Sequence, residues 1–364
     1  MRIILVAGAR PNFMKIAPLM EAMSGHSRLE PVLVHTGQHY DRQMSELFFD
    51  QLHIAKPDVN LGVGSGSQAV QTAEVMKSFE PVVLSRRPDA VLVVGDVNST
   101  IACALVAAKL AVPVVHVEAG LRSRDRSMPE EINRILTDAI SDLLFCTEPA
   151  AVANLQREGV APGRVHLVGN VMIDTLLRHR HASRQSAILQ RLGLEEGCYA
   201  VLTLHRPANV DDPAVLAGLL EAMEHVQRDM PVVFPVHPRT RASLGANPTL
   251  SGRLGTMANM RLIEPAGYLD FLRLMSDARV VLTDSGGIQE ETTILKVPCL
   301  TLRDSTERPI TAQIGSNQIV GTDPARILSA YRRVMSDDLP PPQTPPLWDG
   351  QAAQRIVEIL AATL

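Results

Sequence analysis

Short runs of hydrophobic, often β-branched residues alternate with longer amphipathic stretches from one end of the chain to the other. The runs have the length of β-strands, and the stretches between them have the length and spacing of helices. Runs that are hydrophobic throughout are typical of strands buried on both faces, as in parallel sheets covered by helices. The pattern therefore predicts an α/β fold built on parallel sheets.

The predicted strands form two series, each long enough for a sheet of its own. The first series is Ile3–Ala7, Pro31–Thr36, Ala90–Gly95, Val112–Val117, Leu143–Cys146 and Val165–Val168. The second series is Ala200–Leu204, Val232–Val236, Met260–Ile263, Val280–Thr283 and Pro298–Leu302. Two series predict two doubly wound domains, which we place at residues 1–172 and 173–349.

Three other segments complete the predicted organisation. The polar, helix-compatible stretch Leu176–Arg191 is interpreted as the connection between the domains. The proline-rich segment Leu339–Pro346 is predicted to be an extended surface strap. Residues Gly350–Leu364 are predicted to form a final helix.

Composition and charge exclude several classes of protein. Hydrophobic residues make up 46% of the 364 residues and charged residues 20%, which is typical of a globular protein. The net charge of −4 provides no basic field for nucleic acid or an anionic membrane surface. No stretch approaches the ~20 apolar residues of a membrane helix, and the first apolar run is too short for a signal peptide. We expect a protein that binds neither nucleic acid nor membrane.

The four cysteines are dispersed along the chain and form no C-x-x-C pair: Cys103, Cys146, Cys198 and Cys299. Reduced thiols in a cytoplasmic protein are therefore expected, rather than disulfides or a zinc site.

Polar residues with reactive side chains recur where predicted strands end. They are Arg10, Asp96, Glu118, His205, His237 and Asp284. In open α/β sheets, ligands bind outside the carboxyl ends of the strands. One such residue is compatible with a solvated turn, but six in equivalent positions favour a functional cleft.

Two cations accompany the first strand–helix turn. Pro11 suits the first turn of a helix, which places Arg10 and Lys15 near the helix N-terminus. Cations there oppose the helix dipole, so a bound anion would complete the site. Two ordinary surface cations are the alternative.

The segment from Val281 to Glu291 predicts a strand, a glycine turn and a helix. Ser285, Gly286 and Gly287 would let backbone N–H groups approach phosphate oxygens. Glu291, one turn into the helix, is placed to accept hydrogen bonds from ribose hydroxyls. The alternative is a capped helix whose acids complement the dipole.

Carboxylates form a third candidate group. Asp96 and Glu118 end otherwise apolar strands, and Glu130 and Glu131 begin a predicted helix. Together they are suited to acid–base catalysis, because like charges and partial burial raise carboxyl pKa values toward neutrality. Simple helix N-terminal charge is the alternative for Glu130 and Glu131.

The remaining motifs suggest a base and a diphosphate contact, and they exclude a nicotinamide cofactor. His205 is a candidate base or phosphate donor, and neither it nor His237 has zinc-ligand spacing. The arginines Arg303 and Arg308 suit a diphosphate, because the guanidinium group binds it bidentately. The glycine-rich Gly62–Gly66 lacks the dinucleotide spacing, and a loop is expected there.

Seven of these motifs, in order, resemble the non-hydrolysing UDP-N-acetylglucosamine 2-epimerases. They are ARPNFMKIAPL, TGQHYD, HVEAGLRS, MPEEINR, TLHRP, TDSGGIQEE and RDSTERP, which span residues 9–309. The resemblance implies the GT-B architecture, with two Rossmann-like domains, an active site in the cleft between them and a last helix (350–364) that returns to the first domain. It further implies a cytoplasmic homodimer acting on a UDP-sugar in polysaccharide biosynthesis.

The resemblance also implies roles for individual residues. Asp96, Glu118, Glu130 and His205 match the family's catalytic residues. The residues that match its substrate contacts are Arg10, Lys15, Ser285, Gly286, Gly287, Glu291, Arg308 and, beside uracil, Phe271. A second, activating substrate site is implied for the region of TGQHYDRQM. The implied reaction eliminates UDP to give 2-acetamidoglucal and adds it back, which requires neither metal nor redox cofactor.

Two departures from the family pattern leave the substrate open. Ala208 stands where many members have a glutamate, and Ala266 stands where some have a glutamine. A related UDP-sugar, such as UDP-2,3-diacetamido-glucuronic acid, is therefore an alternative substrate. A hydrolysing epimerase and a GT-B glycosyltransferase are alternatives for the reaction. A UDP-sugar-binding regulator without turnover is a third, which the set of three carboxylates disfavours.

Overall fold

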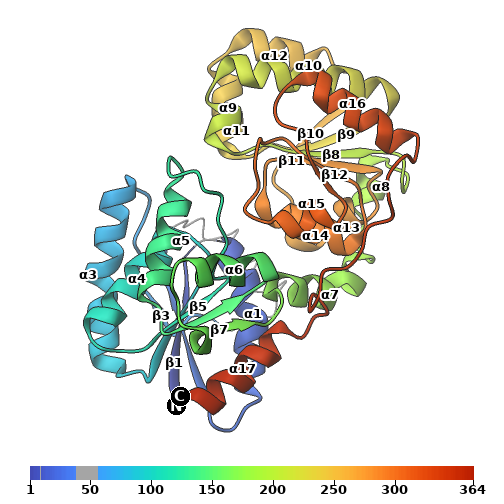
Figure 1. Ribbon diagram of the computed structural model, residues 1–364. Helices are drawn as coiled ribbons and strands as arrows, with labels where there is room; N and C mark the ends of the chain where they lie inside the picture. Colours follow the sequence, from blue (N-terminus) through green and yellow to red (C-terminus); the bar gives the residue numbers. More distant parts are fainter. Residues whose placement is uncertain (9, 38–55) are drawn as a thin grey trace. The chain divides into compact units, whose positions relative to one another are not determined.

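The computed structural model divides the chain into two compact units (Figure 1). It describes residues 1–8, 10–37 and 56–364, with the side chains of Arg10 and Pro11 excepted. The first unit comprises Met1–Arg178 and Pro346–Leu364, and the second comprises His179–Pro345. The second unit is thus one continuous segment, inserted in sequence between the two segments of the first.

The first unit contains a seven-stranded parallel sheet with the strand order β3-β2-β1-β4-β5-β6-β7. The strands are β1 (Arg2–Ala7), β2 (Glu30–His35), β3 (Val59–Asn60), β4 (Ala90–Val94), β5 (Val114–Val117), β6 (Leu143–Cys146) and β7 (Val165–Leu167). The order reverses between β1 and β4, and such a reversal opens a crevice at the carboxyl ends of the strands. The central strands β1 and β4 are almost completely buried, as their apolar sequences predict.

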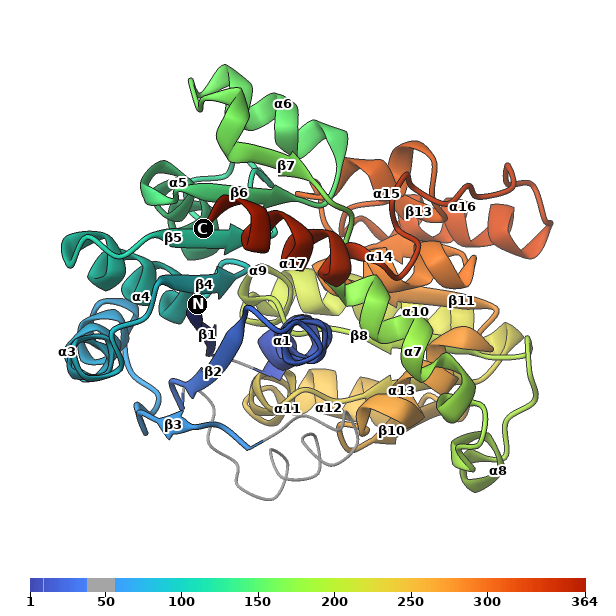
Figure 2. The same cartoon turned by 90° about the horizontal axis from the view of Figure 1, so that it is seen from below.

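Helices cover this sheet, and the last helix of the chain is one of them. The helices are α1 (Arg10–Ser24), α3 (Gln68–Arg86), α4 (Asn98–Lys109), α5 (Pro129–Ile140), α6 (Pro149–Arg157), η1 (Pro162–Arg164), α7 (Val171–Ser183) and α17 (Ala352–Thr363). Helix α17 packs against α1 (Figure 2). It is fixed by Asp174, whose carboxylate accepts hydrogen bonds from the backbone N–H groups of Ala352 and Ala353.

The second unit contains a six-stranded parallel sheet with the order β10-β9-β8-β11-β12-β13. Its strands are β8 (Ala200–Thr203), β9 (Val232–Pro235), β10 (Met260–Ile263), β11 (Val280–Thr283), β12 (Cys299–Thr301) and β13 (Asn317–Ile319). Its helices are α8 (Ile188–Leu192), α9 (Pro207–Val210), α10 (Pro213–Asp229), α11 (Pro238–Gly245), α12 (Pro248–Gly255), α13 (Tyr268–Ser276), α14 (Gly286–Leu295), α15 (Pro309–Gln313) and α16 (Pro324–Met335). Its strand order also reverses, here between β8 and β11.

The predicted fold class is confirmed. Every predicted strand is present, and its ends shift by at most two residues. Two short strands, β3 and β13, were not predicted, because two or three residues containing Asn or Gln carry no strand signal of their own. Residues 62–66 and 339–345 contain neither helix nor strand, and a helix does form at Ala352–Thr363.

The four cysteines are free thiols, of which Cys198 is exposed and the other three are buried. Within the described ranges, every helix is too short or too polar to cross a membrane.

Candidate functional site

Asp96 and Glu118 lie at the carboxyl ends of two paired strands of the first unit. Val94, the last residue of β4, pairs with Val117, the last residue of β5. Gly95 and Asp96 follow the first strand, and Glu118 follows the second. The sheet therefore brings to one edge two predicted catalytic residues that are 22 positions apart in sequence, as expected for strand-end residues.

Glu118 forms a buried ion pair with Lys15, which projects from the second turn of α1. Only 2% of the Glu118 side chain and 10% of the Lys15 side chain are exposed. Glu118 adopts a φ of +74°, a conformation that costs a non-glycine residue about 1–3 kcal/mol. Strained residues of this kind cluster at active sites, ligand clamps and switch regions.

Gly95 leaves room for this ion pair. A Cβ atom on Gly95 would lie 3.0 Å from Lys15 Nζ and 3.4 Å from Glu118 Oε2, and the residue also has a φ of +69°. Glycine meets both requirements without a steric penalty.

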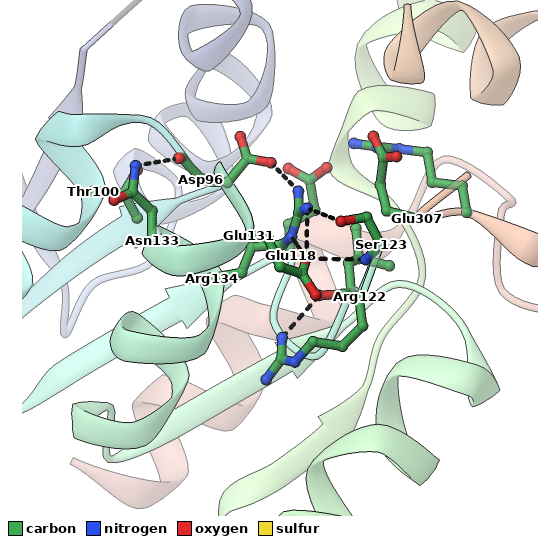
Figure 3. A network of polar contacts seen from close by, with 12 residues as sticks. Asp96, Thr100, Glu118, Arg122, Ser123, Glu131, Asn133, Arg134 and Glu307 are labelled. Carbon is green, nitrogen blue, oxygen red and sulfur yellow. Dashed lines mark hydrogen bonds and ion pairs between the residues drawn. The ribbon is translucent and has the colours of Figure 1, made fainter. Parts of the chain in front are cut away.

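Asp96 is held by Arg134, which projects from α5 beneath the strand ends (Figure 3). Arg134 Nη1 lies 2.5 Å from Asp96 Oδ2, and Arg134 Nη2 lies 2.7 Å from Glu131 Oε2. A quarter of the Asp96 side chain (26%) remains exposed, whereas Arg134 is buried. Asp96 is therefore oriented by the protein and still accessible to a ligand.

Glu131 holds the loop that precedes α5, so the alternative of a plain helix-terminal charge is wrong for this residue. Its carboxylate is buried and accepts hydrogen bonds from the N–H groups of Ser123 and Arg124 as well as from Arg134 (Figure 3). Burial alone would raise the pKa of Glu131, but these hydrogen bonds and the charge of Arg134 lower it. Its neighbour Glu130, the predicted catalytic residue, is only partly buried in the first turn of α5.

Two predicted contacts of the first unit are only partly described. Arg10 begins α1, but its side chain lies outside the described part of the structure. The segment implied for a second substrate site, TGQHYDRQM, falls mostly in residues 38–55, which also lie outside it.

In the second unit, His205 follows β8 and pairs with Asp284, which follows the neighbouring strand β11. His205 Nδ1 lies 2.7 Å from Asp284 Oδ1, and Asp284 also accepts hydrogen bonds from the backbone N–H groups of His205 and Arg206. Burial alone would raise the pKa of Asp284, but the His205 ring and these N–H groups lower it. Asp284 is fully buried, whereas 36% of the His205 side chain is exposed. The carboxylate thus orients a histidine whose other edge is available to a ligand.

The predicted glycine turn forms the N-terminus of α14. Ser285 is the N-cap residue, and Gly286 and Gly287 are the first two helical residues. Helix N-termini carry N–H groups without a partner in the helix and bind anions. A Cβ atom on Gly286 would lie 2.5 Å from Arg308 Nη1, so only glycine allows this arginine to reach the helix N-terminus.

Arg308 is balanced by two buried carboxylates. Its Nη1 lies 2.5 Å from Glu307 Oε1, and its Nε lies 2.7 Å from Glu290 Oε1. Glu307 also pairs with Arg303 at 2.9 Å. The sequence analysis identified both arginines, but it did not anticipate that buried glutamates hold them, with Arg308 beside the helix N-terminus.

Glu291 lies one turn further along α14 and is buried. Burial, reinforced by the neighbouring charge of Glu290, raises its pKa to about 8. Tyr268 Oη lies 3.5 Å from Glu291 Oε1. Phe271 lies on α13, in the same helical turn as Tyr268, and is only partly buried.

The arrangement separates two kinds of chemistry. The strand ends of the first unit carry carboxylates paired with cations, a combination suited to moving protons. The strand ends of the second unit carry a helix N-terminus, an arginine and a histidine, which suit an anionic ligand. Among the described residues, no group of three or more His, Cys, Asp or Glu side chains is arranged to hold a metal ion.

The sequence analysis did not identify Arg134, which joins the side chains of Asp96 and Glu131. It lies within the motif MPEEINR, three residues after Glu131, which is the spacing of neighbours on one helix face. That spacing was the available signal.

Comparison with known proteins places the chain in a family. A family model described as UDP-N-acetylglucosamine 2-epimerase matches residues 21–361. The chain is 39% identical to a UDP-N-acetylglucosamine 2-epimerase of Methanocaldococcus jannaschii, over 99% of both proteins. It is 41% identical to a UDP-2,3-diacetamido-2,3-dideoxy-D-glucuronate 2-epimerase of Pseudomonas aeruginosa, again over 99% of both.

Solved structures agree with this placement. The crystal structure of the Methanocaldococcus jannaschii UDP-GlcNAc 2-epimerase in complex with UDP-GlcNAc and UDP is similar with a TM-score of 0.93 at 39% identity, covering 100% of both chains. The Neisseria meningitidis enzyme bound to UDP-GlcNAc is similar with a TM-score of 0.92 at 30% identity, again with full coverage of both chains. The two Rossmann-like sheets are accordingly of the GT-B type, and the chain belongs to the UDP-N-acetylglucosamine 2-epimerase family.

Proposed function

We propose that this protein is a non-hydrolysing UDP-N-acetylglucosamine 2-epimerase, which interconverts UDP-N-acetylglucosamine and UDP-N-acetylmannosamine. The observation that carries the proposal is the pair of strand-end carboxylates, Asp96 and Glu118, each paired with a buried or nearly buried cation. Family membership supports the same reaction class.

The proposed reaction is an elimination followed by an addition. A carboxylate removes the proton from C2, the electron pair forms the C1=C2 double bond, and the C1–O bond breaks so that UDP leaves with its electrons. UDP oxygen then re-forms the bond to C1, and a protonated group delivers a proton to the opposite face of C2. The reaction needs an acid–base group on each face, and Asp96, Glu118 and Glu130 are the proposed groups.

The leaving group is proposed to be held by the second unit. The diphosphate would accept hydrogen bonds from N–H groups of Ser285, Gly286 and Gly287 at the start of α14 and from Arg308. Glu291 would bind the ribose hydroxyls and Phe271 would contact uracil. His205, oriented by Asp284, would assist the departure of UDP. Arg10 and Lys15 are the proposed contacts from the first unit.

A related sugar is the second candidate substrate. The relative named UDP-2,3-diacetamido-2,3-dideoxy-D-glucuronate 2-epimerase is 41% identical to this chain. The relative named UDP-N-acetylglucosamine 2-epimerase is similarly related, at 39% identity. Ala208 also removes a carboxylate that many family members carry close to the histidine. A shorter, uncharged residue would leave room for a substrate with an additional substituent or a negative charge.

We further propose that the protein is a cytoplasmic homodimer. Helix α4 lies between α3 and α5, and a groove on this face is lined by Ala69, Ala73 and Ile132 among others. The large apolar side chains of Val70, Ile132 and Leu136 are 42–58% exposed on α3 and α5. Covering them with a second copy would remove apolar surface from water. Light scattering on the purified protein tests this, and a monomer at micromolar concentration would contradict it.

The decisive test is product identification by NMR after incubation with UDP-N-acetylglucosamine and, separately, with UDP-N-acetylmannosamine. We expect the same mixture of the two UDP-sugars from either side. Accumulation of free N-acetylmannosamine and UDP would instead establish a hydrolysing epimerase. Turnover of only the diacetamido-glucuronate substrate would establish the second candidate.

A further inference from the structure

A buried histidine lies directly beneath the two strand ends that carry Asp96 and Glu118. His116 is the third residue of β5 and is fully buried. Its Nε2 lies 2.9 Å from the carbonyl oxygen of Gly95, the residue before Asp96. Its Nδ1 lies 2.6 Å from Asp138 Oδ1, on α5.

Both ring nitrogens of His116 face hydrogen-bond acceptors. A carbonyl oxygen only accepts, so Nε2 carries a proton. Asp138 accepts on its other oxygen from the N–H of Gly120 and lies 2.7 Å from Arg122 Nη1. Burial alone would raise the pKa of Asp138, but the contacts with His116 and Arg122 lower it. Because the partner of each ring nitrogen is an acceptor oxygen, both nitrogens of His116 are placed to donate a hydrogen bond.

These two bonds reach both catalytic strand ends. The first bond fixes the Gly95 carbonyl, and Gly95 is the residue whose α-carbon leaves room for the Lys15–Glu118 pair. The second bond fixes Asp138, which in turn holds Gly120, two residues after Glu118. One ring thus ties together the backbone that precedes Asp96 and the backbone that follows Glu118.

Charged side chains next to the ring are paired with one another. Arg122 lies 2.7 Å from Asp138 Oδ2 and 2.6 Å from Glu158 Oε2. Arg122 donates to both carboxylate oxygens of Glu158, at 2.9 and 2.6 Å. A buried ion is tolerated only when it is paired and hydrogen-bonded in this way.

We propose that His116 is a positioning residue, whose ring, hydrogen-bonded at both nitrogens, sets the relative placement of the Asp96 and Glu118 carboxylates by holding Gly95 and Asp138. The inference rests on the proposed function, because it assigns His116 a role in the reaction that these carboxylates perform. His116 itself does not touch the substrate. Its effect is on geometry, where a displacement of about 1 Å can cost about 10²-fold in rate.

Two substitutions separate the two hydrogen bonds. In His116→Gln, the amide nitrogen replaces Nε2 and keeps the bond to the Gly95 carbonyl. In His116→Asn, the amide nitrogen replaces Nδ1 and keeps the bond to Asp138. His166→Gln on β7 is the matched control, because that histidine lies on another strand of the same sheet and is only partly buried.

We expect His116→Asn to lose kcat by about 10- to 10²-fold, with KM and UDP affinity within a few fold of wild type. His116→Gln should retain about tenfold more turnover than His116→Asn, although both lose thermal stability. A purely structural role predicts equal losses that follow the folded fraction. Wild-type kcat in His116→Asn, or equal kcat in the two variants, would overturn the proposal.

NMR of protein with ¹⁵N-labelled histidine supplies a readout that does not depend on activity. The His116 signals, assigned by their loss in His116→Gln, should show a proton on both ring nitrogens. A ring with one unprotonated nitrogen would overturn the inference. Two protons together with no epimerisation by the wild type would instead count against the proposed function alone.

Discussion

The two units share a fold and place their candidate functional residues at the same edge of their sheets, the carboxyl ends of the strands. They differ in the partners and the exposure of the carboxylates found there. In the first unit, the carboxylates of Asp96 and Glu118 lie at the strand ends, 26% and 2% exposed, and cations from helices α5 and α1 hold them. In the second unit, the carboxylate of Asp284 is fully buried and holds the backbone of the histidine turn. Carboxylates are therefore the proposed reactants in the first unit, whereas in the second unit a carboxylate supports the backbone of the site.

The difference extends to backbone conformation. Glu118 adopts a strained φ of +74°, whereas Ser285, the N-cap residue of α14 in the second unit, has an ordinary φ of −84°. A side chain that must be aimed justifies strain, but a helix N-terminus that presents N–H groups does not require it. We therefore propose acid–base chemistry for the first unit and anion binding for the second, a division that experiments can test.

The largest expected effect comes from removing a carboxylate of the first unit. Asp96→Asn and Glu118→Gln should each lower kcat by at least ~10²-fold, the low end of general acid–base contributions. UDP affinity should change little, because most of the proposed UDP contacts lie in the second unit. Steady-state kinetics and calorimetry with UDP measure the two quantities, and Glu74→Gln, on an exposed surface pair, is the matched control.

Glu118→Gln needs a further control, because it leaves Lys15 buried without its partner. Breaking a buried ion pair costs about 3–5 kcal/mol, so some loss of turnover could reflect unfolding. The double variant Lys15→Met with Glu118→Gln removes both charges and should recover thermal stability without recovering turnover. Recovery of turnover in the double variant would contradict a catalytic role for Glu118.

A smaller effect is expected from crowding the anion site of the second unit. Gly286→Ala introduces a Cβ atom 2.5 Å from Arg308 Nη1 and 2.7 Å from Glu307 Oε1, so the arginine must move. We expect UDP affinity to fall roughly 10-fold, or about 1.4 kcal/mol, by calorimetry. Gly252→Ala on α12, where a Cβ meets nothing within 4 Å, is the control. Unchanged affinity in Gly286→Ala would remove α14 from the proposed binding site.

Gly286→Ala is a cleaner probe than Arg308→Ala. Removing the guanidinium would leave Glu290 and Glu307 buried without their counter-charge, at a cost of about 3–5 kcal/mol. A loss of UDP binding in that variant would therefore combine a lost phosphate contact with a destabilised fold.

The smallest effect is a pH dependence of stability due to Glu291. Its pKa is raised from 4.5 to about 8, so the folded state binds the proton more tightly than the unfolded state. Stability should therefore fall as pH rises between these two values. Between about pH 6 and about pH 9, the Tm of the wild type should fall by at least ~2 °C more than the Tm of Glu291→Gln. Parallel Tm curves for the two proteins would contradict the raised pKa.

The sequence predicted the strands well, because buried parallel strands are apolar throughout. The run Ala90–Gly95 illustrates this, since five of its six residues form the fully buried strand β4. The edge strand β13 was missed because its residues Asn317 and Gln318 are polar and its pairing with β12 is set by tertiary structure. Secondary-structure patterns reveal burial on both faces more readily than they reveal pairing at a sheet edge.

At the site, sequence analysis predicted the residue types better than their partners. Glu118 and Lys15 were both identified, but their ion pair spans 103 positions and leaves no local pattern. The same applies to Asp284, which holds a histidine turn 79 positions away. His116 lies inside the motif HVEAGLRS and still went unnoticed, because a single histidine in an apolar strand gives no sign of its two acceptors.

The most direct test of proton transfer at C2 is deuterium incorporation. The protein is incubated with UDP-N-acetylglucosamine in heavy water, and C2 of both UDP-sugars is examined by NMR. Because the proposed acid–base groups are carboxylates, which exchange protons with solvent, we predict that deuterium enters this carbon in the epimerised product. Asp96→Asn and Glu118→Gln should slow its entry together with epimerisation. UDP-N-acetylmannosamine formed with hydrogen retained at C2 would contradict the account.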